Sequence, residues 1–132
     1  MFEILIALLL LSLLAVAALA WFTWNTKRGA ELAIPPRGKF LDLPGGRLHY
    51  TDEGTGPAIV MIHGLGGQMG NFTLALSPLL TQTHRVIVLD RPGMGYSDRA
   101  PDAPANPRAQ AETVAQVIDA LRLKRPLVVG HS

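Results

Sequence analysis

The chain has 132 residues, no cysteine and a formal net charge of +2. This length predicts one soluble domain at most, and the absence of cysteine excludes disulfides and thiolate chemistry. Because the net charge is small and no run of Lys and Arg is interleaved with aromatic residues, we expect no nucleic-acid partner.

The first predicted element is an apolar stretch over residues 4–24, which only Ser12 and Thr23 interrupt. As a helix it would reach roughly 30 Å, about the thickness of a bilayer's hydrocarbon core. Tryptophan and phenylalanine gather at its end and Lys27-Arg28 follow at once, as is typical where a helix leaves a membrane. Residues 1–24 are therefore predicted to form a single-pass transmembrane anchor.

A cleaved signal peptide is the alternative, because Ala18-Leu19-Ala20 has the small-x-small form of a cleavage site. Signal peptides carry positive charge ahead of the apolar region, whereas Glu3 is the only charged side chain there, so a retained anchor is favoured. A buried core helix is disfavoured because the stretch has no polar stripe. The basic residues between positions 27 and 39 favour the cytoplasmic side for the domain that follows.

Residues 25–39 carry charges, two glycines and the Pro35-Pro36 pair without an apolar period, which predicts a linker. Residues 40–132 are then predicted to form the domain. It opens with a hairpin whose strands cover residues 39–43 and 47–52. Apolar and polar residues alternate in the second strand, so we expect one face of the hairpin to be solvated, with His49 pointing outward.

Three short runs of apolar residues then predict strands covered on both faces, at 58–62, 85–89 and 127–130. Helices are expected between them, one over residues 71–80 with Asn71 as its N-cap and one that starts at Asn106-Pro107. This order predicts an α/β fold in which a parallel sheet with crossover helices follows an antiparallel hairpin. Ligands of such sheets bind at the carboxyl ends of the strands.

The first of three suggestive segments at those ends is the glycine-rich loop of residues 63–67, His-Gly-Leu-Gly-Gly. A phosphate-binding P-loop would need Gly-Lys-Ser/Thr, and a dinucleotide fingerprint would need glycine where Met69 stands. An oxyanion hole fits better, with the main-chain N–H of Leu65 as one donor and the N–H of the residue after Ser132 as the other.

The other two segments follow the next two strands. Residues 90–97 read Asp-Arg-Pro-Gly-Met-Gly-Tyr-Ser, and Gly130-His131-Ser132 has the form in which a Gly-x-Ser-x-Gly nucleophile elbow begins. Taken with the glycine-rich loop, these residues resemble the α/β-hydrolase fold superfamily, in its serine hydrolase branch, from about Phe40 onward. The elbow is cut after its serine, so we expect the C-terminal part of the domain to lie beyond residue 132.

The resemblance implies a triad of serine, acid and histidine in which Ser132 attacks an acyl carbon and forms an acyl-enzyme. The family's acid and base follow later strands, so no carboxylate or histidine of this chain is assigned to those roles, and the 132 residues alone are expected to be inactive. A serine at this position counts against the dehalogenase and epoxide hydrolase branches, which place aspartate there.

The remaining candidate residues are expected to support the site. His63, Gly64 and Gly66 would brace the oxyanion loop. Residues of the two other segments would border the site and help to shape it; these are Asp90, Arg91, Tyr96, Ser97 and His131. His84, like His49, is expected to be solvated. No spacing of metal ligands occurs, so neither a metal nor a cofactor is predicted.

The sequence thus predicts a membrane-anchored serine hydrolase that acts on an ester or a related acyl bond. Its partners would be a small-molecule acyl substrate, of lipophilic character because of the anchor, and the membrane through residues 4–24. An acyltransferase or perhydrolase on the same scaffold is one alternative. A non-catalytic interaction module that kept the fold and lost the triad is the other.

Overall fold

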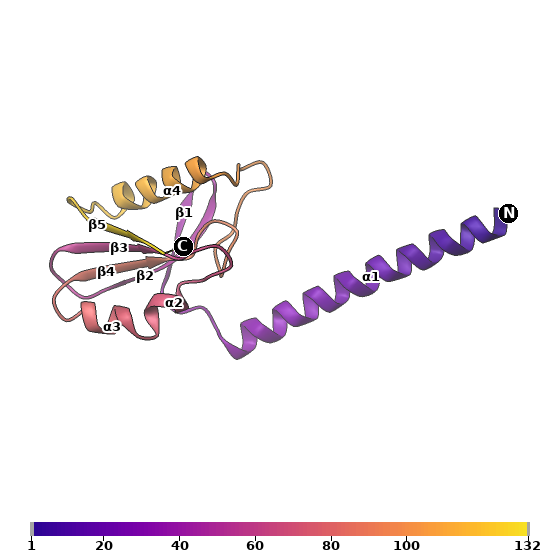
Figure 1. Cartoon of the computed structure of the whole chain (residues 1–132), viewed down its shortest axis with the longest axis horizontal. Helices are drawn as coiled ribbons and strands as arrows, with labels where there is room; N and C mark the ends of the chain where they lie inside the picture. Colours follow the sequence, from indigo (N-terminus) through magenta and orange to yellow (C-terminus); the bar gives the residue numbers. More distant parts are fainter. Residues whose placement is uncertain (1, 132) are drawn as a thin grey trace. The chain divides into compact units, whose positions relative to one another are not determined.

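The computed structural model describes residues 2–131, in two units whose boundary lies between Pro36 and Arg37. The first unit contains one long helix, α1 (Phe2–Ala33) (Figure 1). All of its described residues are exposed. By length and composition this helix could cross a membrane, with a mean hydropathy of 2.8 over its most apolar window, and a signal sequence near an N-terminus would meet the same criteria.

Helix α1 extends beyond the predicted apolar stretch, because residues 25–33, expected to form a linker, are helical. These residues lack an apolar period, but most of them are good helix formers, and a single glycine does not end a helix. Lys27 and Glu31 pair one turn apart, with 3.6 Å between Nζ and Oε1. The helix ends at Ala33, because Ile34 precedes Pro35 and a residue before proline is disfavoured in the helical conformation.

The second unit is built on a five-stranded sheet with the order β1-β2-β4-β3-β5. The strands are β1 (Lys39–Leu43), β2 (Gly46–Glu53), β3 (Ala58–Ile62), β4 (Arg85–Leu89) and β5 (Leu127–Gly130). Strand β2 pairs with β1 and β4 in antiparallel fashion, and β3 pairs with β4 and β5 in parallel. The predicted α/β fold, an antiparallel hairpin followed by parallel strands, is confirmed.

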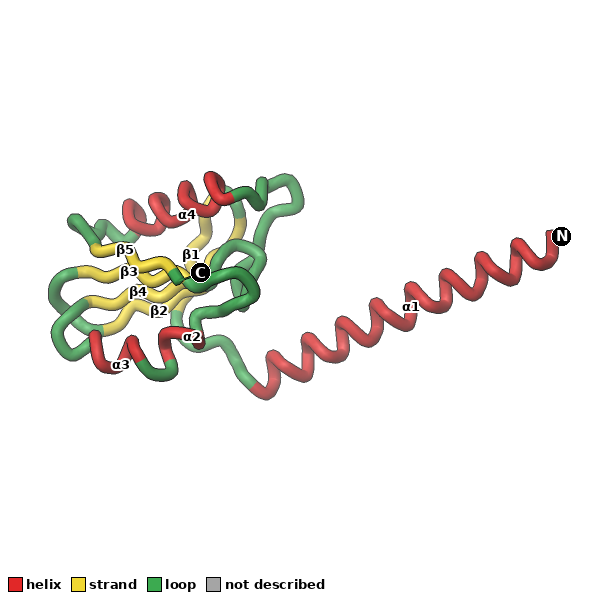
Figure 2. The backbone as a smooth tube through the Cα atoms, viewed as in Figure 1, coloured by secondary structure: helices red, strands yellow, loops and turns green. Residues whose placement is uncertain are grey.

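Helices cover both faces of this sheet (Figure 2). On one face α4 (Pro107–Ala120) packs Val117 against Ile87 and Leu89 of β4. On the other, Phe72 of α2 (Gly70–Thr73) packs in a second cluster with the alternate residues of β4, and α3 (Leu76–Leu80) follows α2. The continuous apolar run in β4 thus supplies both cores, as expected of a strand covered on two sides.

Helix α4 begins as predicted. The Asn106 side chain accepts a hydrogen bond from the Ala109 N–H at 2.9 Å, and Pro107 occupies the first helical position, where its missing N–H costs nothing.

The prediction of one helix over residues 71–80 is wrong. Two short helices occur, and the chain breaks between them at Ala75, whose φ of −136° is not helical. Pro78 explains the break, because its ring would clash with the carbonyl four residues earlier in a continuous helix. Asn71 is not the N-cap either: its Oδ1 accepts from the Gln68 N–H at 3.2 Å, and the cap position of α2 belongs to Met69.

The expectation of a half-solvated hairpin is also wrong for β2. Residues 48–51 are all buried, although only Leu48 and Tyr50 are hydrophobic. Leu48 and Tyr50 pack in the core cluster that contains Val117 of α4, and the rings of Phe40 and Tyr96 pack against His49, so neither face is left to solvent over this stretch.

Candidate active site

The three predicted site segments begin next to one another at the carboxyl ends of the parallel strands. Ile62, the last residue of β3, pairs with Leu89 of β4 on one side and with Gly130 of β5 on the other. The N–H of His131 donates to the Ile62 carbonyl at 2.9 Å, which continues this pairing past the end of β5. The loops after the three strands therefore start side by side.

The loop after β3 makes a tight turn that presents the Leu65 main chain. The Gly67 N–H donates to the Gly64 carbonyl at 3.1 Å, and Gly66 has a φ of +70° while that of Leu65 is not positive, which is the pattern of a type II turn. The Leu65 residue is 89% exposed. Within residues 2–131 its N–H has no hydrogen-bond acceptor, so this donor is available to a ligand.

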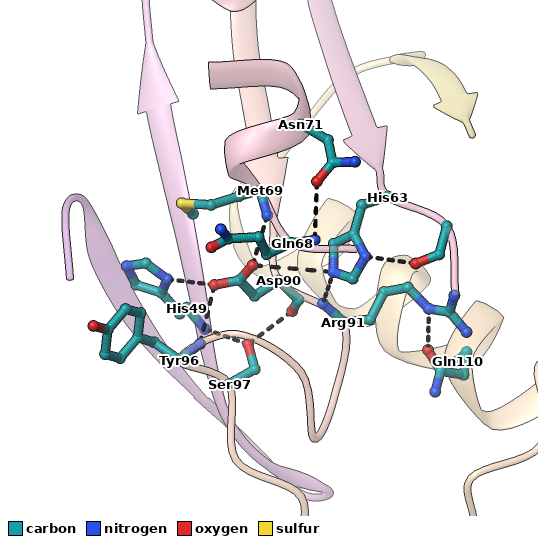
Figure 3. Close-up of polar contacts among 11 residues, drawn as sticks. His49, His63, Gln68, Met69, Asn71, Asp90, Arg91, Tyr96, Ser97 and Gln110 are labelled. Carbon is teal, nitrogen blue, oxygen red and sulfur yellow. Dashed lines mark hydrogen bonds and ion pairs between the residues drawn. The ribbon is translucent and has the colours of Figure 1, made fainter. Parts of the chain in front are cut away.

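His63 joins the loop after β3 to the loop after β4. Its buried ring meets the Gly64 carbonyl through Nδ1 at 2.9 Å and receives the Arg91 N–H on Nε2 at 3.0 Å (Figure 3). Nε2 is thus an acceptor and Nδ1 a donor, so His63 is the neutral tautomer with its proton on Nδ1. Both ring nitrogens are occupied by the main chain, which makes His63 a brace between two loops.

Asp90 is the centre of the site's hydrogen-bond network and is fully buried. One carboxylate oxygen accepts from the Met69 N–H at 2.7 Å, and the other accepts from the Tyr96 N–H at 3.1 Å and faces Nδ1 of His49 at 2.8 Å (Figure 3). Its main-chain carbonyl accepts from the Ser97 hydroxyl at 2.7 Å. A single side chain therefore fixes the start of α2, two residues after the glycine-rich loop, and the return of the loop after β4.

Arg91 and Tyr96, the other predicted border residues, point in different directions. The Arg91 guanidinium donates through Nε to the side chain of Gln110, on α4, at 2.8 Å. The Tyr96 ring meets the edge of the His49 ring, with 5.4 Å between their centroids. Neither contact places a charged group against the Leu65 turn.

The expectation that His49 is solvated is wrong, because the residue is 1% exposed and bonded to Asp90. Its neighbours Phe40 and Tyr96 cover the ring, with centroids 4.8 and 5.4 Å away. Alternation of polar and apolar residues could not show this, since a buried histidine and a solvated one look alike until the partner carboxylate is found. His84 has an exposed contact with the Thr83 hydroxyl at 2.8 Å.

Residues 57–132 match the family described as alpha/beta hydrolase fold. The chain belongs to the α/β-hydrolase fold family. It is 31% identical over 111 residues to the 2-hydroxy-6-oxo-6-phenylhexa-2,4-dienoate hydrolase of Comamonas testosteroni, an alignment that covers 82% of this chain and 37% of that enzyme. The chain thus spans about a third of the length of the curated relatives it matches.

Solved structures agree with this membership. The chain is similar to a putative lipase from Acinetobacter baumannii, with a TM-score of 0.68 and 29% identity over 73% of this chain and 33% of that one. It is also similar to an esterase from Exiguobacterium antarcticum, with a TM-score of 0.64 and 28% identity over 72% and 35% of the two chains.

Ser132, the predicted nucleophile of this α/β-hydrolase, lies outside the described residues. Its neighbour His131 is exposed, and its ring meets the Phe72 ring edge-on at a centroid distance of 6.5 Å. No group of three potential metal ligands comes together in the part of the chain that the structure describes.

Proposed function

We propose that this α/β-hydrolase is a membrane-anchored serine hydrolase that cleaves an ester or a related acyl bond of a small lipophilic molecule. The observation that carries the proposal is the Leu65 N–H, which has no acceptor among residues 2–131 and sits on an exposed turn. The turn follows β3, and the adjacent strand β5 leads directly to the proposed nucleophile, Ser132.

In the proposed reaction the Ser132 hydroxyl oxygen attacks the acyl carbon and loses its proton to a base, while the carbonyl oxygen takes on negative charge. The Leu65 N–H and the N–H of the residue after Ser132 would stabilise that oxyanion. The leaving alcohol departs with a proton, which leaves an acyl-enzyme, and water then attacks the ester and frees the acid and the serine.

His49 and His63 are poor candidates for that base. Both ring nitrogens of His63 are bonded to the main chain, and those of His49 face Asp90 and the Arg37 carbonyl inside the domain. This agrees with the family pattern, in which the histidine and the acid follow later strands.

The anchor supports the lipophilic character of the substrate. A helix that holds the domain at a bilayer gives it access to molecules that partition there, and residues 4–24 have the length and composition for this. We propose that the basic residues after this stretch hold the domain on the cytoplasmic side.

A fluorophosphonate probe tests the nucleophile, since it reacts with activated serines. The full-length protein should be labelled and Ser132→Ala should not. Thr55→Ala, which removes an exposed hydroxyl at the opposite end of β3, is the matched control and should label like the parent. Undiminished labelling of the Ser132→Ala variant would refute the assignment.

The similarity to the Comamonas testosteroni hydrolase favours a second substrate class, 2-hydroxy-6-oxo dienoates, for the same site. Turnover of p-nitrophenyl esters and of 2-hydroxy-6-oxo-6-phenylhexa-2,4-dienoate by the full-length protein separates the two. Ester turnover alone supports the main proposal, and dienoate turnover alone replaces it, with Ser132→Ala abolishing either activity.

A further inference from the structure

His49 makes hydrogen bonds outside the β-sheet ladder through its ring and its main chain. Its ring nitrogens lie 2.8 Å from the Asp90 carboxylate and 2.7 Å from the Arg37 carbonyl. Its main-chain N–H donates to the Ser97 hydroxyl at 2.8 Å, and its carbonyl accepts from the Asp90 N–H at 2.9 Å. Four bonds therefore connect this residue to the segment before β1 and to the loop after β4.

The partners of the ring determine how many protons it carries. The Arg37 carbonyl can only accept, so Nε2 of His49 must donate. Nδ1 faces a carboxylate oxygen of Asp90, and both oxygens of that carboxylate already act as acceptors, for the Met69 and Tyr96 N–H groups. Nδ1 must then donate as well, and a histidine with two N–H groups is an imidazolium cation.

The surroundings of the ring suit a buried cation. Asp90 is the charged group in contact with it, and the rings of Phe40 and Tyr96 pack against it. Arg47 lies over the Phe40 ring, 4.0 Å from its centroid, and His63, which is neutral, lies 4.0 Å from the other oxygen of Asp90. By their hydrogen-bond partners, the ring of His49 carries two N–H groups and the ring of His63 carries one.

We propose that His49 is a positioning residue whose buried positive charge fixes the Asp90 carboxylate, and through it the loop that presents Leu65. The second oxygen of Asp90 accepts from the Met69 N–H at 2.7 Å, at the cap of α2, two residues after the glycine-rich loop. A neutral residue at position 49 cannot balance the carboxylate, so Asp90 would no longer hold that loop in one place. The catalytic part of this inference rests on the proposed oxyanion hole.

The charge is tested first, and independently of activity. The 15N NMR signals of the histidine rings are recorded on the full-length protein at mildly alkaline pH, where an exposed histidine is neutral. His49 should show two protonated nitrogens, and His63 the neutral form with its proton on Nδ1. Assignment comes from the signals missing in His49→Gln and His63→Gln. A neutral His49 would overturn the proposal.

Positioning is tested by the kinetics of His49→Gln in the full-length protein. We expect kcat to fall at least tenfold and KM to change less than twofold, since only an interaction with the transition state is weakened. His84→Gln changes a half-buried histidine just before β4, at the end of that strand opposite Asp90. It is the control and should keep the parent kcat. A folded His49→Gln with the parent kcat would refute positioning.

These measurements keep the two proposals apart. If Ser132→Ala is still labelled, the proposed nucleophile fails, while an imidazolium at position 49 would still establish the buried cation. If His49→Gln does not fold, the NMR signals of the parent protein decide on the charge, and the rate of fluorophosphonate labelling of Asp90→Asn decides on positioning. That rate should fall at least tenfold, and an unchanged rate would refute positioning.

Discussion

The main-chain N–H of Leu65 can be removed without removing the turn that holds it. Proline is favoured at the second position of a type II turn, which Leu65 occupies ahead of Gly66. Leu65→Pro in the full-length protein should therefore lower kcat by about 10²- to 10³-fold, the typical loss of one oxyanion donor. Leu65→Ala truncates the same exposed side chain and keeps the N–H. Equal kcat values for the two variants would remove Leu65 from the oxyanion hole.

Gly95 is the residue that lets the loop after β4 pass close to Asp90. A Cβ atom built on it would overlap the Asp90 carboxylate, and its φ of +54° strains any other residue. Gly95→Ala should lower the free energy of unfolding by about 2–3 kcal/mol, as overpacking of a buried site does. Gly45→Ala is the control, because a Cβ there meets nothing within 4 Å. Equal denaturant midpoints for the two variants would contradict the requirement for glycine at position 95.

Strands β2 and β4 are held together by one ion pair as well as by their ladder. Nε and Nη2 of Arg85 each donate to the Asp52 carboxylate at 2.8 Å. The hydrogen bond from Arg85, with further help from its charge and that of Lys39, lowers the pKa of Asp52 below its ordinary value of 3.8. The stability that this pair contributes is present above that value and is lost as the pH falls through the lower pKa of the folded state.

Asp52→Asn should therefore lower the free energy of unfolding at neutral pH by about 1.5–3 kcal/mol, the range for a hydrogen bond to a charged group. The difference from the parent should shrink as the pH is taken below 3.8. Asp42→Asn is the control, since its contact with Arg47 spans 4.0 Å and its side chain is 92% exposed. Urea denaturation over a pH series measures the free energy of unfolding of each variant. A difference between Asp52→Asn and the parent that grows in acid would contradict the lowered pKa of Asp52.

The strands and helices were predictable where the pattern of apolar and polar residues had one interpretation. The continuous apolar runs located β3, β4 and β5 to the residue, because such short runs between turns leave few alternatives. The expectation that β5 is covered on both faces is wrong, since Leu127 and Val128 of this edge strand are 62% and 47% exposed. The helix expected over residues 71–80 failed on Pro78, a single residue that outweighs a good apolar period. Residues 25–33 became helical because helix propensity needs no apolar face.

The site was predictable to the level of its loops and no further. Motifs identified the three loops, since glycine spacing and strand ends are visible in a sequence. The pairing of His49 with Asp90 was not visible, because it joins residues 41 positions apart through the antiparallel pairing of β2 with β4. Local alternation in β2 suggested the opposite orientation for that histidine.

At the scale of the whole molecule, the chain combines an α/β-hydrolase domain with a helix that packs on nothing within its own unit, since no residue of α1 in the described part is buried. A helix with such exposed leucines needs an apolar environment. If the anchor is retained, the bilayer supplies this apolar environment for residues 4–24. If the segment is a signal peptide, a signal peptidase cuts after Ala20 and removes residues 1–20. The two outcomes give mature chains that differ by residues 1–20.

Two lysines in the apolar stretch distinguish these outcomes. Leu10→Lys with Leu14→Lys should release the full-length protein from membranes washed with alkaline carbonate, because each lysine near the helix centre costs about 3 kcal/mol of insertion free energy. The control, Ala30→Lys with Leu32→Lys, adds the same charge to α1 beyond the stretch and should stay in the membrane pellet. N-terminal sequencing of the unmodified protein completes the test. A mature chain that begins at Trp21 would contradict the anchor and identify residues 1–20 as a signal peptide.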